Sequence, residues 1–281
     1  MTQPSFPEIN PDQSLDLLKE LHILTRDGKM NQDSRRKLKQ VYHLYNFIRP
    51  MLQEMYQKAV DENKNYLIVD HGAGKSYLGF ILYDLFLKQK DFGQIMGIET
   101  RKELVTKSEE LAQKLNFTRM KFYHLSVEES IASNLLPPEV DMVTALPACD
   151  TATDDAIKFA LSKKAKYVVL IPCCQAEVAA TLKLHKEQSL HTCPLTELWR
   201  HPLHTREFGS HVTNVLRCLQ LEAFGYQVTV TELTGHEHSM KNELILARLH
   251  QRPGQKAGEK VKRILADLNL HDLMERFFVP M

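Results

Sequence analysis

Between residues 66 and 249 the chain alternates short runs of strand-forming residues with longer amphipathic stretches, and this alternation constrains the fold more than any other feature. The strand-like runs cover residues 66–70, 94–99, 121–126, 141–146, 166–172, 227–233 and 243–249. Strands that alternate with helices of such length form parallel β-α-β units in a doubly wound sheet. Only nine residues separate the last two runs, too few for a crossover helix, so this pair should be antiparallel. The sequence therefore predicts an α/β, Rossmann-like fold with a seven-stranded, mostly parallel sheet and an antiparallel terminal strand.

Helical patterns flank this alternating region on both sides. From Ser14 to about Asp61 apolar residues recur at helical spacing, and Pro50 is expected to interrupt the helix. A basic helical segment follows Pro253. We therefore expect three parts: a helical N-terminal extension at residues 1–62, an α/β domain at 63–252 and a helical tail at 253–281.

The composition excludes several classes of protein. The 281 residues are 43% hydrophobic and 25% charged, which is ordinary for a globular chain. Thirty-six basic and thirty-five acidic residues give a net charge of +1, so the whole chain is not attracted electrostatically to nucleic acid or to a membrane. It has no run of 18 apolar residues and no signal-peptide pattern, and its five cysteines include no CxxC pair. We expect a cytoplasmic protein that is not bound to a membrane.

A glycine-containing loop, DHGAGKS, follows the first strand and precedes a helix. A Walker-type phosphate loop would need glycine where Val69 stands, and a dinucleotide fingerprint would need a small residue where Tyr77 stands. The pattern that remains, D-x-G-x-G, consists of Asp70, Gly72 and Gly74. Because an acidic residue suits a cofactor with an amino group and a sulfonium, we assign these three residues to S-adenosyl-L-methionine. A tight turn without a ligand is the alternative.

Polar residues at the next two strand ends support the same cofactor. Glu99 ends the second strand, where an acidic side chain can accept hydrogen bonds from both ribose hydroxyls. A solvent-exposed carboxylate is the alternative for Glu99. Ser126 ends the third strand, where a polar group would contact adenine. Together with the glycine loop, these positions predict S-adenosylmethionine binding.

Cysteines follow the fourth and fifth strands, in the segments LPACDTATDDA and IPCCQAE. Because parallel strands open into one crevice at their carboxyl ends, these segments should lie side by side. The candidate catalytic residues are Cys149, Asp150, Cys173 and Cys174. A cysteine could attack a pyrimidine covalently and Asp150 could serve as acid or base, or all four could shape the pocket without bonding. Adjacent cysteines match zinc-ligand spacing poorly, so we expect no metal.

Histidines and basic residues suggest a substrate face. The candidates on the loops near the sixth strand and at the start of the preceding helix are His204, Arg206, His236 and Lys241. Basic runs at residues 26–39, which include Arg36 and Lys39, and at residues 248–263 contain few acidic residues. Such runs either form solvated helix surfaces or contact phosphates, and phosphate contacts would make binding strongly salt-dependent.

Six segments together resemble a known family. They are VDHGAGKSYLGFILYDLF, IETRKELVTKSEELAQKL, ALPACDTATDDAI, IPCCQAE, HTREFGSHVTNVLRCLQLEAFGYQVTVTEL and HEHSMKNELILARL. They resemble bacterial class I methyltransferases of a domain family that also includes the glutathione S-transferase C-terminal-domain-containing protein. The Cys-Cys pair after a late strand is similar to that of eukaryotic tRNA 2′-O-methyltransferases. The resemblance covers about residues 25 to 250.

This resemblance implies an S-adenosylmethionine-dependent methyltransferase that modifies RNA, either tRNA or rRNA. Two alternatives stay open. The enzyme could methylate a small molecule or a protein, in which case the basic runs are ordinary surface. The chain could also be a relative that binds RNA or another partner without catalysis.

Overall fold

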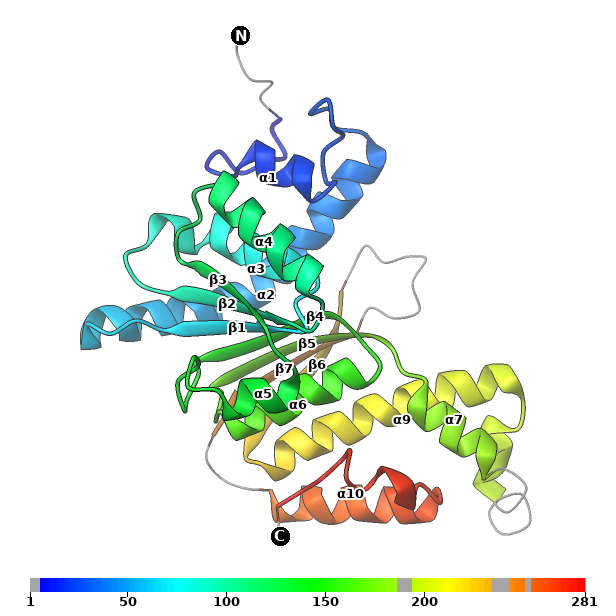
Figure 1. Ribbon diagram of the computed structural model, residues 1–281. Helices are drawn as coiled ribbons and strands as arrows, with labels where there is room; N and C mark the ends of the chain where they lie inside the picture. Colours follow the sequence, from blue (N-terminus) through cyan, green and yellow to red (C-terminus); the bar gives the residue numbers. More distant parts are fainter. Residues whose placement is uncertain (1–5, 186–193, 234–242, 251–253, 281) are drawn as a thin grey trace.

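The computed structural model describes residues 6–185, 194–233, 243–250 and 254–280, with only the backbone described at 147–149 and 173–174. Within these residues seven strands form one sheet in the order β3-β2-β1-β4-β5-β7-β6 (Figure 1). The strands are β1 (Leu67–His71), β2 (Gln94–Glu99), β3 (Met120–His124), β4 (Met142–Cys149), β5 (Tyr167–Cys174), β6 (Tyr226–Glu232) and β7 (Glu243–Leu249). The first five are parallel, and β7 is antiparallel to both β5 and β6. The predicted architecture is therefore confirmed.

Helices cover both faces of this sheet (Figure 1). They are α1 (Leu15–Glu20), α2 (Gln32–Glu62), α3 (Tyr77–Leu85), α4 (Lys102–Lys114), α5 (Val127–Ala132), α6 (Thr151–Ser162), α7 (Glu177–Leu184), α9 (Pro202–Ala223) and α10 (Gln255–Asp267), with 3-10 helices η1 (Leu87–Gln89), η2 (Pro194–Trp199) and η3 (His271–Leu273). Side chains from α2, α3 and α4 pack on one face, and those from α5, α6 and α9 pack on the other. Consecutive residues of β1 are buried on opposite faces, Ile68 on the first and Val69 on the second. This two-sided burial explains why the central strands are continuous apolar runs in the sequence.

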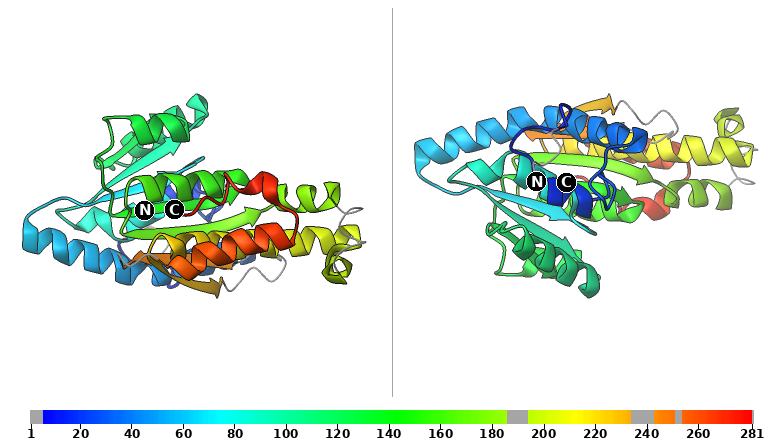
Figure 2. Two further views of the ribbon diagram at one scale, coloured as in Figure 1. Left: turned by 90° about the horizontal axis from the view of Figure 1, so that it is seen from below. Right: turned by 90° about the horizontal axis from the view of Figure 1, so that it is seen from above.

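The N-terminal segment differs from the prediction at Pro50. Helix α2 is 31 residues long, is not interrupted at this proline, and runs along the sheet (Figure 2). A proline within a helix removes one backbone hydrogen bond, here to the carbonyl of Asn46. Pro50 and Asn46 are both exposed, so water can bond to the freed carbonyl. Ile48 and Leu52 on the opposite side are fully buried in the core, and this packing holds the helix together across the proline.

Helices α7, α9 and α10 form a second layer beyond the sheet with its own apolar cluster. Helix α7 and the first turns of α9 project past the carboxyl ends of the strands (Figure 1). No helix in the described part of the chain is both long enough and apolar enough to span a membrane.

A close contact between α7 and α9 at Gly209 yields a stability prediction. A Cβ atom at this position would lie 2.7 Å from both the Cα and the Cβ of Ala179. We expect Gly209→Ala to lower the free energy of unfolding by about 1–3 kcal/mol, because the helices must separate. Gly258 in α10 is the matched control, since a Cβ there would lie no closer than 3.5 Å to Val279. Gly258→Ala should stabilise by about 0.5–1 kcal/mol through helix propensity. Urea unfolding measures both, and equal effects of the two substitutions would contradict this account.

Candidate active site

A cavity of about 410 Å³ lies at the carboxyl ends of β1, β2 and β3. It is lined by His71, Gly72, Ile98, Glu99, Thr100, Arg101, Leu125, Val127, Ala152 and Asp155. Ligand pockets for small molecules have volumes of roughly 300–1,000 Å³. Two of the predicted cofactor residues, Gly72 and Glu99, are among the lining residues.

The loop after β1 exposes bare backbone toward this cavity. Gly72 has a φ of 64° and Gly74 a φ of 59°, conformations that favour glycine. A Cβ at Gly72 would meet no atom within 4 Å, so the space beside this residue is open. The loop ends at Ser76, which also has a positive φ of 49°. A ligand can therefore approach the main chain closely at Gly72.

Asp70 has a different position from the one that we predicted. Its carboxylate is fully buried and accepts hydrogen bonds from the hydroxyls of Ser76 (2.8 Å) and Thr144 (2.9 Å). Burial raises the pKa of Asp70 to about 6, although these hydrogen bonds lower it. Asp70 therefore does not line the cavity. Its two hydrogen bonds connect the end of the glycine loop at Ser76 to β4 at Thr144.

Glu99 is placed as predicted, at the end of β2 on the cavity wall. Its carboxylate accepts hydrogen bonds from the amide of Gly74 (2.7 Å), the amide of Arg101 (3.0 Å) and the Arg101 side chain (3.1 Å). Burial alone would raise the pKa of Glu99, but these hydrogen bonds outweigh it and hold the pKa below the ordinary value. The carboxylate is therefore charged. The Arg101 side chain is 60% exposed, so it can move aside for a ligand.

Ser126 is a helix cap. Its hydroxyl accepts a hydrogen bond from the amide of Glu129 (3.2 Å), and the Glu129 carboxylate accepts one from the amide of Ser126 (2.7 Å). This reciprocal pair is a capping box, which starts α5. Ser126 itself does not line the cavity, whereas its apolar neighbours Leu125 and Val127 do, so the contact of Ser126 with adenine stays a prediction.

His71 is a cavity residue that the sequence analysis missed. Its side chain is 5% exposed, and neither ring nitrogen has a hydrogen-bond partner among the described residues. One face of the ring lies against Phe159, with 5.0 Å between the ring centres. Burial lowers the pKa of His71 to about 4, so the imidazole is neutral near pH 7. A buried polar group without a partner costs about 1–3 kcal/mol, and native proteins contain few of them.

The lowered pKa of His71 predicts a pH-dependent stability. Below its unfolded pKa of about 6.5 the unfolded chain binds a proton at this residue that the folded chain does not, so stability is lost as the pH falls toward 4. His71→Leu removes this loss. The native chain should lose about 3 kcal/mol of stability at this residue between pH 7 and pH 4. The free energy of unfolding of the variant minus that of the native chain should therefore increase by about 3 kcal/mol as the pH is lowered. Urea unfolding at pH 4, 5, 6 and 7 measures the difference, and a difference that does not change with pH would contradict the prediction.

The ends of β4 and β5 lie side by side, as predicted. The strand register places the backbone of Cys149 opposite that of Cys174, with irregular pairing after Ala145. The side chains of Cys149, Cys173 and Cys174 lie outside the described part of the structure. Ligand-accessible strand ends of this kind are the usual place for a substrate in an open α/β sheet.

Asp150, which we predicted as an acid or base, has a structural contact in this region. One of its carboxylate oxygens accepts hydrogen bonds from the amides of Ala176 (3.0 Å) and Glu177 (3.3 Å), at the start of α7. Its backbone has a φ of 46° and a ψ of −121°, a strained conformation for a residue other than glycine. Asp150 therefore links the segment after β4 to the segment after β5, and its role as an acid or base stays a prediction.

A buried ion pair, which we did not predict from the sequence, contacts the backbone of Asp150. Arg217 of α9 is 0% exposed and bonds to both carboxylate oxygens of Asp154, at 2.8 and 2.7 Å. The same guanidinium donates to the carbonyl of Asp150 (2.8 Å) and to the side chain of Asn214 (3.2 Å). Gln175, the residue after β5, donates to Asn214 as well (3.1 Å). One arginine thus connects both segments that follow the strand ends.

The predicted substrate residues that the structure describes lie in two places, as their separate positions in the sequence suggested. Arg36 and Lys39 lie on α2, which packs on the opposite face of the sheet from α9, and Arg36 is paired with Asp33 (2.6 Å). His204 and Arg206 lie exposed near the start of α9, with Arg206 paired to Glu207 (2.8 Å). His236 and Lys241 lie outside the described residues.

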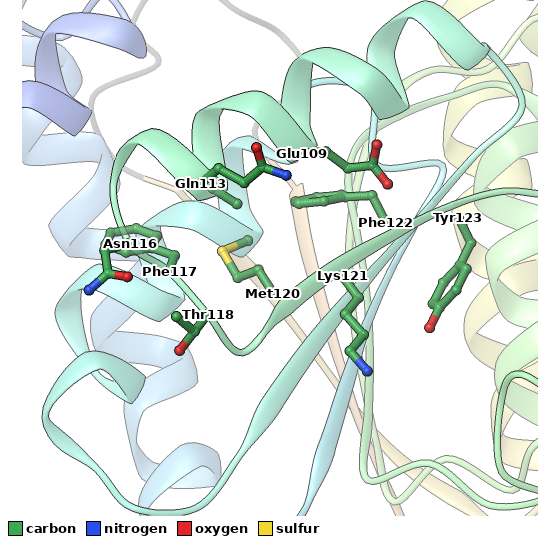
Figure 3. A pocket seen from close by; sticks show the side chains of 10 residues that line it. Glu109, Gln113, Asn116, Phe117, Thr118, Met120, Lys121, Phe122 and Tyr123 are labelled. Carbon is green, nitrogen blue, oxygen red and sulfur yellow. The ribbon is translucent and has the colours of Figure 1, made fainter.

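A second hollow of about 500 Å³ lies at the outer edge of the sheet, between α4 and β3. Figure 3 shows Glu109 and Gln113 of α4 above Met120 and Phe122 of β3. It is larger than the first cavity, but it contains none of the predicted site residues and is away from the strand ends. We therefore place the active site at the first cavity.

Comparisons with known proteins identify the family of the chain. A family model described as a methyltransferase domain matches residues 36–181, just over half of the chain. No curated protein matches the chain.

Several solved structures are similar to the chain at low identity. A putative O-methyltransferase from Klebsiella pneumoniae is 13% identical, with 88% of this chain and 91% of that one covered and a TM-score of 0.48. An SAH-bound methyltransferase from Podospora anserina is 13% identical, with 85% and 88% covered and a TM-score of 0.45. Fibrillarin from Aeropyrum pernix with natively bound S-adenosyl-L-methionine is 12% identical, with 65% and 66% covered and a TM-score of 0.39. With the sheet, the cavity and the family match in place, the chain belongs to the methyltransferase domain family and is an S-adenosylmethionine-dependent methyltransferase.

Proposed function

We propose that this enzyme methylates RNA. The observation that carries the proposal is the solvent face of α10. Lys256, Lys260 and Lys262 are exposed there, and none has a carboxylate within ion-pair distance among the residues that the structure describes. The other face of α10 packs on α9 through Val261 and Leu265. The exposed face of this helix carries more basic than acidic side chains, with Glu259 and Asp267 as its acids, and a basic face suits the phosphate backbone of a nucleic acid.

The basic run on α2 supports the proposal less. Arg35 pairs with Glu8 (2.9 Å), and Arg36 and Lys37 both pair with Asp33 (2.6 and 2.8 Å). Three cations here share two carboxylates, so most of this charge is compensated, and we assign phosphate binding to α10 in preference to α2. Lys39 keeps its predicted role as a possible contact, since it lines a groove on α2.

The cavity residues fit S-adenosylmethionine. The charged carboxylate of Glu99 can accept from both ribose hydroxyls once Arg101 moves aside. The bare backbone of Gly72 and Gly74 suits the amino-acid end of the cofactor. When bound, the cofactor supplies an electrophilic methyl group. The chain's own residues then hold the acceptor near the ends of β4 and β5, and a base is needed only if the acceptor must lose a proton.

Cys149, Cys173 and Cys174 would line the acceptor side of this site. If one of them attacks a pyrimidine, RNA that contains 5-fluoropyrimidine should form a stable covalent complex with the enzyme. Of the variants Cys149→Ala, Cys173→Ala and Cys174→Ala, the one that lacks the attacking cysteine should then form no complex. Full activity in all three variants, with no trapped complex, would leave these cysteines a pocket-forming role only.

The RNA proposal is tested by following the methyl group. Nucleoside mass spectrometry of total RNA from cells with and without the gene should show one modified nucleoside lost in the deletion. Labelled S-adenosylmethionine added to deletion-cell extract with the purified enzyme should transfer label to the RNA fraction. Label in the protein or small-molecule fraction, with an unchanged nucleoside profile, would replace RNA as the acceptor.

The α10 surface gives a binding prediction. Replacing Lys256, Lys260 and Lys262 together by glutamate should weaken RNA binding at low salt by at least about tenfold and make its salt dependence shallower, because phosphate contacts are lost. The matched control is Lys37→Glu on α2, where the charge is already paired. Filter binding from 50 to 200 mM salt measures both. An affinity lowered equally by the control, or unaffected by the triple substitution, would contradict the role of α10.

A further inference from the structure

The C-terminal segment, residues 268–280, turns back along α10 after the end of that helix (Figure 1). Phe277 is 1% exposed, within the apolar cluster that α7, α9 and α10 share. The Gln220 side chain of α9 donates hydrogen bonds to the carbonyls of Arg276 (3.3 Å) and Phe278 (3.0 Å). These contacts fix the backbone on both sides of Phe277, from which the Arg276 side chain extends.

The guanidinium of Arg276 contacts the first turns of two other helices. It donates hydrogen bonds to both carboxylate oxygens of Glu177, the first residue of α7, at 3.1 and 3.2 Å. It also lies 3.7 Å from the carboxylate of Asp155, in the second turn of α6. An arginine that bonds to a carboxylate at two points fixes its orientation as well as its distance. Arg276 therefore holds the start of α7 in a defined position beside α6.

The two carboxylates that face Arg276 belong to different parts of the site. Asp155 lines the cofactor cavity. The amide of Glu177 donates to the carboxylate of Asp150 (3.3 Å), so Glu177 is bonded to the segment that follows β4 while it directly follows the segment after β5. One side chain from the C-terminal segment thus contacts both the wall of the cofactor cavity and the segments that we propose for the acceptor.

We propose that Arg276 is a positioning residue for methyl transfer, which holds α6 and α7 so that the bound cofactor and the acceptor keep a fixed separation. The transfer requires the methyl group and the acceptor atom to be in line, and a displacement of about 1 Å can lower such a rate by about 100-fold. Arg276 does not line the cavity, so it acts through Asp155 and Glu177. The inference rests on the methyltransferase activity and not on RNA as the acceptor.

Kinetics of label transfer from S-adenosylmethionine provide the first test, with the extract fraction that the native enzyme labels as the acceptor. Arg276→Gln should lower kcat at least about tenfold and change the KM for S-adenosylmethionine less than about threefold. Glu177→Gln should give a similar loss, and the double variant should lose no more than either alone, because both substitutions remove the same contact. Lys166→Gln is the matched control. Lys166 is 31% exposed, against 29% for Arg276, and pairs with Glu54 (2.7 Å) at the opposite end of β5.

The control should keep kcat within about twofold of the native value. A loss of rate in Arg276→Gln that only matches the loss of folded protein, measured by thermal unfolding, would overturn the proposal, because the pair would then be a stabilising contact alone. So would a native kcat in this variant.

Hydrogen exchange of the free enzyme provides the second test, which needs no acceptor. The amides of Ala176 and Glu177 donate to Asp150, and they should exchange at least about tenfold faster in Arg276→Gln than in the native enzyme or in Lys166→Gln. Native protection of these amides would overturn the proposal. Label that the native enzyme transfers to protein or to a small molecule would contradict only RNA as the acceptor, and the comparison of the variants would then be made with that fraction.

Discussion

Arg217→Met is expected to lower the free energy of unfolding by about 3–5 kcal/mol, the largest stability effect that the structure predicts. The guanidinium is fully buried and makes four hydrogen bonds to protein acceptors. Its removal leaves the buried Asp154 carboxylate without the cation that bonds to both of its oxygens. Methionine fills much of the volume but donates no hydrogen bond, so urea unfolding at pH 7 should show nearly the full penalty.

A second substitution separates the charge from the packing. In Arg217→Met with Asp154→Leu both charges are absent, and replacing a buried ion pair by apolar residues is often close to neutral. The double variant should therefore recover most of the lost stability. Arg263→Met is the matched control, because its pair with Asp267 (3.6 Å) is exposed and should contribute less than about 1 kcal/mol. A cost below 1 kcal/mol for Arg217→Met would show that the pair does not hold the structure in this way.

The same arginine connects stability with function. Asp150 has a strained backbone, and such conformations persist only where the surrounding contacts fix them. Arg217 bonds to the carbonyl of Asp150, while the Asp150 carboxylate bonds to the start of α7. Loss of Arg217 should therefore loosen the segments after β4 and β5 together. These are the segments that carry the cysteines of the proposed acceptor site.

The fold was predictable because its signals are local. Buried parallel strands are apolar runs, and the runs at 94–99 and 243–249 match β2 and β7 to the residue. The short helices α5 and α7 were missed because six and eight residues carry too little helical periodicity. The prediction that Pro50 interrupts the helix was wrong. The sequence does not show that the proline faces solvent while Ile48 and Leu52 hold α2 against the sheet.

The site was predictable only to the level of the backbone. The location of Gly72 and Glu99 at one cavity could be predicted because topology alone brings strand ends together. Asp70 was misplaced because its partner Thr144 is 74 residues away in sequence. Ser126 could have been recognised, since Ser126 and Glu129 form the S-x-x-E pattern of a capping box. Arg217 also left a signal, an arginine between the apolar residues of a helix, but only the structure identifies Asp154 as its partner.

Glu99→Gln is expected to weaken S-adenosylhomocysteine binding by about 100-fold, the largest functional effect that the cavity predicts. A carboxylate can accept from both ribose hydroxyls, whereas an amide presents one acceptor and one donor, and hydrogen bonds to a charged group contribute about 1.5–3 kcal/mol. The glutamine oxygen can still accept from the amide of Gly74, so the loop should keep its shape. The group that faces Arg101 becomes a donor, so the free variant should also lose some stability, and affinities are compared at a temperature at which both proteins are folded.

Glu103→Gln is the matched control for Glu99, because Glu103 is an exposed acid in the first turn of α4 and does not line the cavity. Isothermal titration gives the affinities, and thermal unfolding provides an independent measure. A ligand at 100 times its dissociation constant stabilises the folded state by about 2.7 kcal/mol, so a concentration that stabilises the native enzyme this much should barely stabilise Glu99→Gln. If both variants bind equally well, Glu99 serves only to anchor Gly74 and Arg101. The ribose must then be held by other groups of the same cavity, such as the backbone of Gly72.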